Sequence, residues 1–155
     1  MCRLISGACV VALVSSAIGV PPAGGPKGSP EDAKSTKVTV VSAKRADKWS
    51  ETSTELTPKS PDDVVLVVDI AGVSIDEFQR LHNTARAKIF LSAGDKRYDP
   101  SMFVSGAWRE PDGSLKEERL ILVIVPRSAR ALELHYVDSP PVRFTVSTAI
   151  TPKLP

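Results

Sequence analysis

The sequence predicts an all-β fold, an antiparallel β-sandwich with one short helix. Apolar or alternating segments of strand length recur about eight times along the chain, and proline and glycine separate them. Strands do not alternate with long helices, a pattern that would favour a parallel sheet. With 155 residues, 42% hydrophobic and 25% charged, the chain is expected to build one domain around one core. A small β-barrel is the alternative fold.

Residues 1–19 have the anatomy of a secretory signal peptide. A short positive segment precedes an uncharged run over residues 4–18, and Ala17 and Gly19 are small, as signal peptidase requires. We therefore expect an exported protein, whether secreted, periplasmic or at the cell surface, from which residues 1–19 are removed. The alternative is membrane anchoring, through an uncleaved leader or through a lipidated Cys9, which follows a partial lipoprotein box.

Removal of the leader would also remove every cysteine, because Cys2 and Cys9 both lie within it. Disulfides, a thiol nucleophile and a cysteine-based zinc site are then excluded from the mature protein. Residues 20–36 are rich in Pro, Gly, Ser and Lys and predict a disordered tether. A sandwich domain over residues 37–150 and a flexible tail over residues 151–155 complete the expected organisation.

The first part of the domain contains the strand that the sequence predicts most clearly. Residues 37–44 carry β-branched side chains at nearly every second position and predict the first strand. The polar stretch 45–63 predicts a long loop, with a short edge strand near Trp49. Residues 64–73 (VVLVVDIAGV) are so densely apolar that we expect them in the middle of a sheet with both faces covered.

One short helix is expected after this strand. Ser74 and Glu77 have the spacing of a capping box, which predicts a helix that runs to about His82. Residues 87–91 and 96–99 then predict a small hairpin, with its turn at residues 92–95.

The sequence of the second half of the domain predicts four more strands. Pro100 is expected to break the ladder before a strand at residues 103–109, on which Val104 and Trp108 share one side. The turn residues at 110–114 predict a hairpin tip. An apolar strand at residues 120–125 ends at Pro126, and strands at residues 131–136 and 142–146 alternate, so the expected inward residues are Leu132, Leu134, Tyr136, Val142, Phe144 and Val146.

The sequence contains no evident catalytic constellation. Nucleophilic catalysis would need a serine or threonine served by His82 or His135. His82 is expected at a helix end and His135 on the solvent-exposed face of a strand. No nucleophile elbow surrounds any serine. We therefore expect no catalytic residues and no enzyme. A hydrolase with an unrecognised Ser–His pair is the enzymatic alternative.

No metal or cofactor site is expected either. Asp95, Asp99 and Asp112 could gather around calcium, but their spacing matches no calcium loop and suits solvated turns. Adjacent carboxylates, such as Asp62 and Asp63, would point to opposite faces of a strand and make poor acid–base partners. Gly94 and the glycines at 24–25 lack the strand-to-helix setting of a phosphate cradle.

The two tryptophans are the candidate aromatic platforms. Trp108 is expected to pack in the core, because Val104 lies on the same side of its strand. Trp49 lies in a polar stretch, where core packing and an exposed ring that stacks on a sugar or a partner are equally consistent with the sequence.

From residue 37 onward, the order of elements resembles the telokin-like, immunoglobulin-like extracellular domains of bacterial secreted proteins and lipoproteins. The resemblance is carried by residues 37–41 (KVTVV), 64–70 (VVLVVDI), 94–98 (GDKRY) and 120–136 (LILVIVPRSARALELHY). It implies an immunoglobulin-like sandwich and an exported location, with no catalytic residues. The predicted helix departs from a minimal sandwich of this kind.

These observations lead to a functional expectation. A net charge of only +2, without a Lys/Arg block, argues against nucleic-acid binding. We expect no stable membrane span after processing. The expected function is that of a non-enzymatic interaction or structural module, whose partner is an unknown protein or small molecule. A small-ligand or carbohydrate-binding domain is the alternative.

Overall fold

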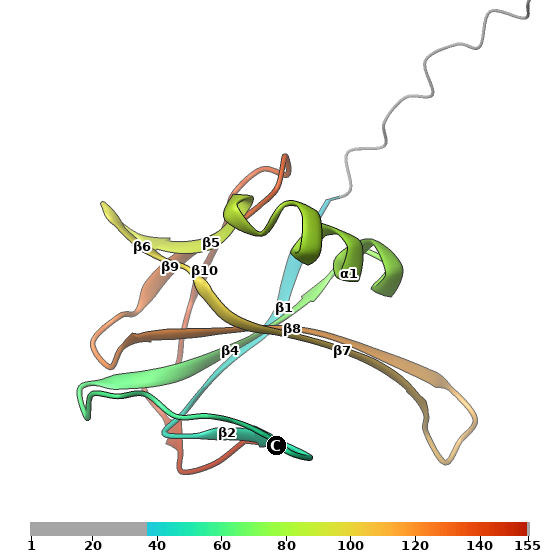
Figure 1. The fold of residues 1–155 in the computed structure, drawn as a ribbon, viewed down its shortest axis with the longest axis horizontal. Helices are drawn as coiled ribbons and strands as arrows, with labels where there is room; N and C mark the ends of the chain where they lie inside the picture. The colour runs from blue at the N-terminus through green and yellow to red at the C-terminus, as the bar shows by residue number, and fades with distance from the viewer. Residues whose placement is uncertain (1–36, 155) are drawn as a thin grey trace, which may run out of the picture. The chain divides into compact units, whose positions relative to one another are not determined.

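The computed structural model describes residues 37–154. The predicted signal peptide at residues 1–19, the predicted tether at residues 20–36 and both cysteines lie outside the described residues. The described chain forms two facing β-sheets, a separate β-hairpin and one α-helix (Figure 1).

The larger sheet has five strands and the smaller sheet has four. In spatial order, the larger sheet contains β11 (Ile150–Thr151), β1 (Thr39–Ala46), β4 (Asp63–Ala71), β8 (Leu115–Pro126) and β7 (Pro100–Arg109). The smaller sheet contains β10 (Val142–Thr145), β9 (Ala131–Tyr136), β5 (Ile89–Ala93) and β6 (Lys96–Tyr98), and the separate hairpin contains β2 (Trp49–Glu51) and β3 (Thr54–Leu56).

Both sheets are open, which confirms the predicted sandwich and shows that the small-barrel alternative is wrong. Neighbouring strands pair antiparallel, except that the short strand β11 runs parallel to β1. The strands near residues 131–136 and 142–146 lie where the sequence predicts them. The strand predicted at residues 37–44 is shifted to β1, Thr39–Ala46.

Strand β4 is buried on both faces, as its apolar run predicts. Val64, Leu66 and Val68 face the smaller sheet and belong to the main core. Val65 and Val67 face the opposite way and pack beneath the β2–β3 hairpin. A strand covered on two sides needs apolar residues at every position, which explains why alternation is absent here.

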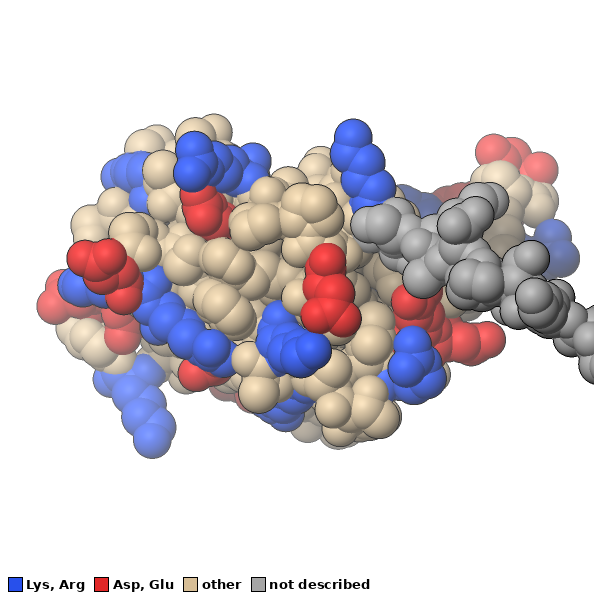
Figure 2. All heavy atoms as spheres, turned by 90° about the horizontal axis from the view of Figure 1, so that it is seen from above, with Lys and Arg blue, Asp and Glu red and all other residues tan. Residues whose placement is uncertain are grey.

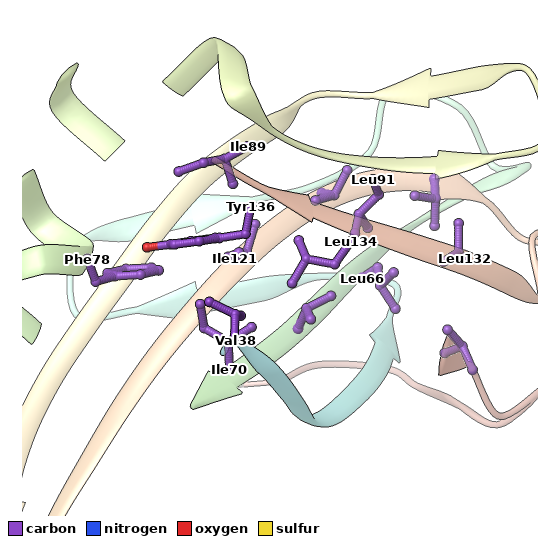
Figure 3. Packing of buried hydrophobic residues seen from close by; sticks show 14 of the residues in the cluster. Val38, Leu66, Ile70, Phe78, Ile89, Leu91, Ile121, Leu132, Leu134 and Tyr136 are labelled. Atoms are coloured by element: carbon purple, nitrogen blue, oxygen red, sulfur yellow. The ribbon is translucent and has the colours of Figure 1, made fainter. Parts of the chain in front are cut away.

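The main core fills the space between the two sheets (Figure 3). Strand β8 contributes Ile121 and Val123 from one side, and the alternating strand β9 contributes Leu132 and Leu134 from the other. The inward face predicted for β9 is therefore confirmed, and Val146 after β10 is buried as well.

Helix α1 (Ile75–Thr84) begins at the predicted cap. The Ser74 Oγ accepts a hydrogen bond from the Glu77 amide at 3.2 Å, which satisfies one of the free donors of the first turn. Phe78 is the residue of α1 that is buried in the main core. The helix extends two residues past the predicted end at His82, because the Ala85 amide still donates to the Leu81 carbonyl at 2.7 Å, and a short 3₁₀ turn at Arg86–Lys88 follows. This turn replaces the start of the strand predicted at residue 87.

Strand β7 begins at Pro100, three residues before the strand predicted at residues 103–109. Pro100 pairs with Val123, and the register then shifts before Met102. A proline is tolerated at this position because it is the first residue of an edge strand. The predicted hairpin tip is confirmed, since the Glu110 amide donates to the Ser114 carbonyl at 2.9 Å and Gly113 has φ of 85°.

The stretch predicted as a long loop, residues 45–63, is more ordered than expected. Strand β1 continues to Ala46, and the β2–β3 hairpin follows. The C-terminal residues expected to form a flexible tail also pair: Thr151 lies opposite Ala46 in β11, and Leu154 forms a bridge with Trp49. These pairings occupy the outer edge of β1 and hold the hairpin, and such short strands are below the length at which a sequence pattern can be recognised.

One charged side chain is buried among the described residues. Arg45 is 1% exposed, and its Nη1 donates to the Arg127 carbonyl at 2.8 Å. Its Nε and Nη2 atoms have no partner within the described chain. Burial, with the nearby charge of Arg130, lowers the pKa of this guanidinium.

Tyr136 offers a test of the inter-sheet packing. Its side chain is 2% exposed, and its hydroxyl points toward Phe78 without a hydrogen-bond partner in the described chain (Figure 3). Burial, followed by the charge of Glu77, raises the pKa of Tyr136 to about 12. The folded state therefore favours the neutral phenol.

We expect Tyr136→Phe to be neutral or stabilising by about 1 kcal/mol at pH 7, because it removes an unpaired buried hydroxyl. Because the pKa of the phenol is 10 when unfolded and about 12 when folded, its titration leaves stability unchanged below pH 10 and lowers it as pH rises from 10 toward 12. Wild type should therefore lose about 2–3 kcal/mol relative to Tyr136→Phe over this range. Urea unfolding at a series of pH values measures the difference. Parallel declines of the two proteins would contradict the buried, unpaired phenol.

Candidate functional site

A hollow follows strand β7 along the edge that pairs with no other strand of the described chain. Its volume is about 430 Å³. The residues that line it come from β7, α1 and the β2–β3 hairpin: Trp49, Glu51, Thr54, Gln79, His82, Asn83, Met102, Phe103, Val104 and Ser105. We call this hollow the β7 groove.

The wall formed by α1 is both aromatic and polar. His82 stacks on Phe103 with ring centroids 5.2 Å apart and planes at 11°. The Gln79 Nε2 donates to the Ser105 Oγ at 3.0 Å. Arg86, just after the helix, donates to the Pro100 carbonyl at 2.8 Å and lies over the Phe103 ring. His82 is therefore held against β7 by stacking as well as by its place at the helix end.

The Nδ1 atom of His82 is buried and has no hydrogen-bond partner within the described chain. A buried polar atom without a partner costs free energy, so the stacking of His82 on Phe103 has to offset this cost. The contact of His82 with Phe103 joins residues 21 positions apart, so the local pattern that predicts a capping residue or a catalytic base does not reveal it.

The opposite wall is built on Trp49. This side chain is 1% exposed and packs with Val65, Leu120 and Leu122 between the β2–β3 hairpin and the larger sheet. Trp49 is therefore a core residue, and its buried ring is not free to stack on a sugar. Met102 and Val104 of β7 pack against the same cluster and form the floor of the groove on this side.

The free edge of β7 lacks most of the features that usually prevent strands from pairing there. The register shift and Pro100 disturb one end of the edge, and Arg109 places a charge at the other. Residues 102–108 between them contain no charged side chain and no proline. A long uncharged edge of this kind is a template for an added strand.

Beyond the groove, β7 and β8 continue as a bare hairpin. The pairing of β4 with β8 ends at Leu120, which lies opposite Val104 on β7. The rest of the hairpin therefore has no third strand beside β8, and it projects from the sheet in Figure 1. We call residues 106–118 the arm.

Trp108 lies on the arm and is 38% exposed, so the prediction that it packs in the core is wrong. It shares a strand face with Val104, as predicted, but it lies outside the Trp49 cluster against which Val104 packs. The Trp108 Nε1 donates to the Glu110 Oε1 at 3.1 Å, and the Lys116 Nζ lies 5.4 Å from the ring centroid. These contacts leave part of the indole open to solvent.

Two carboxylates lie where the arm leaves the sheet, on the side of the β2–β3 hairpin. Burial raises the pKa of the Asp69 carboxyl. Burial also raises the pKa of the Glu118 carboxyl, and the charges of Asp69 and Glu51 add to the effect. A cation that approaches these carboxylates would reduce the electrostatic repulsion between them.

A second polar cluster lies on the outer face of the smaller sheet. The register of β5 and β9 brings Ser92 to His135, and the Ser92 Oγ lies 3.0 Å from the His135 Nε2. Phe90 stacks on His135 with centroids 4.3 Å apart, and Arg97 lies 3.9 Å from the Phe90 centroid. Because Ser92 and His135 are 43 residues apart, the sequence alone could not pair them.

The geometry of this cluster differs from that of a hydrolytic triad. Glu133 lies 3.8 Å from the same Nε2 atom that contacts Ser92, and it also pairs with Arg143. In a triad the carboxylate contacts the other ring nitrogen, where it orients the imidazole as a base. A hollow of about 810 Å³, larger than the β7 groove, lies beside Ser92, Glu133 and Arg143.

The candidate calcium ligands are not brought together. Asp99 pairs with Arg97 at 2.8 Å. Asp112 accepts a hydrogen bond from the Ser114 amide at 2.9 Å, and hydrogen bonds from Ser114 lower the pKa of the Asp112 carboxyl. Asp95 lies in the β5–β6 turn. Within residues 37–154, no three His, Cys, Asp or Glu side chains gather as a metal site would require.

Positive and negative side chains are interspersed on the face shown in Figure 2. None of the helices in the described part of the chain is long and apolar enough to cross a membrane. Comparison with known proteins finds no matching family model, no matching curated protein and no matching solved structure.

Proposed function

We propose that this protein is an exported, non-enzymatic interaction module that holds an extended segment of a partner protein in the β7 groove. The observation that carries the proposal is the uncharged free edge at residues 102–108, which runs beside a hollow between two walls. Main-chain hydrogen bonds to such an edge supply affinity, and pockets for alternate side chains supply specificity.

The two walls favour a partner segment with alternating character. A side chain that faces the β2–β3 hairpin would meet Met102, Val104 and the edge of the Trp49 cluster. The next side chain would face α1, where the exposed Gln79 amide has a second N–H to donate beside its bond to Ser105. We therefore expect apolar residues at every second position and polar residues between them.

The exported location is part of the proposal and rests on residues 1–19. N-terminal sequencing of the protein recovered from an expressing culture should begin at residue 20. Retention of Met1 would favour an uncleaved leader, and a modified N-terminal Cys9 would favour the lipoprotein alternative. The immunoglobulin-like resemblance stays a prediction, and a shared fold would not assign a function in any case.

Peptide selection tests the proposed function. Random heptapeptides selected on the purified full-length Trp108→Ala variant should converge on alternating apolar sequences with Kd values of about 1–100 µM. Trp108→Ala removes the exposed indole of the arm, so that copies of the chain cannot associate through this ring during selection. Isothermal titration of synthetic peptides measures the affinity.

A pair of double variants tests the position of the site: one places two lysines in the groove, and the matched control places two lysines away from it. Thr54 and Gln79 are exposed wall residues, and lysine at both should weaken peptide binding at least about tenfold by narrowing the groove. Lysines at the exposed Thr57 and Ser128 add the same charge elsewhere and should leave binding unchanged. Equal losses in both double variants, or peptides that bind only near Ser92 and His135, would refute the proposal.

A further inference from the structure

The free edge of β7 has two halves of opposite character. Residues 102–105 line the groove between α1 and the β2–β3 hairpin. Residues 106–109 belong to the arm, where Ala107, Trp108 and Arg109 are exposed. One half of the same strand therefore lines the β7 groove, and the other half belongs to the arm, which has no third strand beside it.

Antiparallel pairing of this edge with itself is restricted by backbone geometry. Along a regular strand, the amide and carbonyl of every second residue point toward the free edge. Two identical edges can match these groups only if the two-fold axis passes through a residue rather than between two residues. Under that condition, directly opposed side chains lie on the same face of the joined sheet.

These restrictions determine which residues of the second copy lie opposite Trp108. Within the regular part of the edge, past the register shift at Pro100, the axis can pass through Ser105 or Gly106, and Trp108 of one copy then lies opposite Met102 or Val104 of the other. In each case the ring lies on the face of the Trp49 cluster, because Met102, Val104 and Trp108 share that face with the β2–β3 side of the groove.

We propose that the occupant of the β7 groove is the arm of a second copy of this chain, in a two-fold dimer formed through antiparallel β7–β7 pairing. This inference rests on the proposed function, because it uses the same groove. Each copy inserts its arm between α1 and the β2–β3 hairpin of the other, so both contacts are made twice, as a two-fold interface requires.

The charge pattern permits this edge to pair with itself. In a two-fold pair, a charged residue near the axis would lie close to its own copy, and like charges opposed across strands are destabilising. Residues 102–108 contain no charge to be opposed in this way. The exposed indole of Trp108 supplies the large aromatic anchor that binding sites commonly use.

Two measurements on the full-length chain test the dimer. Sedimentation equilibrium between roughly 1 µM and 1 mM should show a monomer–dimer transition, and Trp108→Ala should weaken it at least about tenfold. The control is Val41→Ala, which removes a side chain that is 62% exposed on β1 and should leave the transition unchanged. The tryptophan emission of wild type should shift to the blue as the dimer forms.

The fluorescence shift identifies the contact. Trp49 and Trp108 are the two tryptophans of the chain, and Trp49 is already buried in one copy. Trp108→Phe should therefore abolish the concentration-dependent shift. A monomer throughout the range, or a dimer that Trp108→Ala leaves intact, would overturn the inference.

The two proposals can fail separately. A monomeric wild type whose groove still binds selected peptides would remove the dimer and keep the peptide-binding function. A Trp108-dependent dimer with no peptide binding to the Trp108→Ala variant would keep the dimer and remove the wider function.

Discussion

Trp49→Ala is expected to lower the free energy of unfolding by about 3–5 kcal/mol. The indole is 1% exposed and fills the space between the β2–β3 hairpin and the larger sheet. Its loss would leave a cavity beside Val65, Val67 and Leu122, which lie on rigid central strands and cannot close it. Urea unfolding followed by far-ultraviolet circular dichroism measures the change.

Trp108→Ala is the matched control, because it makes the same substitution on the exposed arm. At a concentration where the chain is monomeric, it should change the free energy of unfolding by no more than about 0.5 kcal/mol. A large loss for Trp108 with a small loss for Trp49 would reverse the roles that the structure assigns to the two rings.

Gly72→Ala is the second substitution with a large expected effect, above about 3 kcal/mol. Gly72 has φ of 92°, a conformation that other residues adopt with strain. A Cβ atom there would also lie 2.2 Å from the carbonyl oxygen of Lys37. Since the obstacle is backbone, the chain at the start of β1 would have to move. Thermal and urea unfolding both report the loss.

Gly113→Ala separates the cost of the positive φ from the cost of the close contact with the Lys37 carbonyl. Gly113 has a similar φ of 85°, but a Cβ atom there would meet nothing within 4 Å. This variant should lose only the roughly 1–2 kcal/mol that a positive φ costs a residue with a side chain. Equal losses at Gly72 and Gly113 would show that the close approach of Lys37 to Gly72 is not important for stability.

The parts of the fold that the sequence predicts well are those specified by local pattern. The apolar runs in β4 and β8, the alternation of β9 and the capping box at Ser74 each depend on neighbours along the chain. The turn at residues 110–114 is predicted for the same reason, because its proline and glycine fix local backbone angles.

The features that the sequence does not reveal depend on distant segments. The burial of Trp49 requires β4 and β8, together with a bridge to Leu154 near the C-terminus. The exposure of Trp108 follows from the extent of the Trp49 cluster, which includes Val104 but not Trp108 and which its own strand cannot indicate. The contact between Ser92 and His135 needs the register of β5 against β9. The β7 groove joins three such segments and has no sequence motif.

Hydrogen–deuterium exchange of the β7 amides tests the central claim most directly. The claim is that the free edge at residues 102–108 is the surface through which this protein binds. Full-length protein at high concentration, or the Trp108→Ala variant with a selected peptide, should show slower exchange at these residues than the dilute free protein. Protection at Ser92 and His135 with unchanged exchange along β7 would contradict the account.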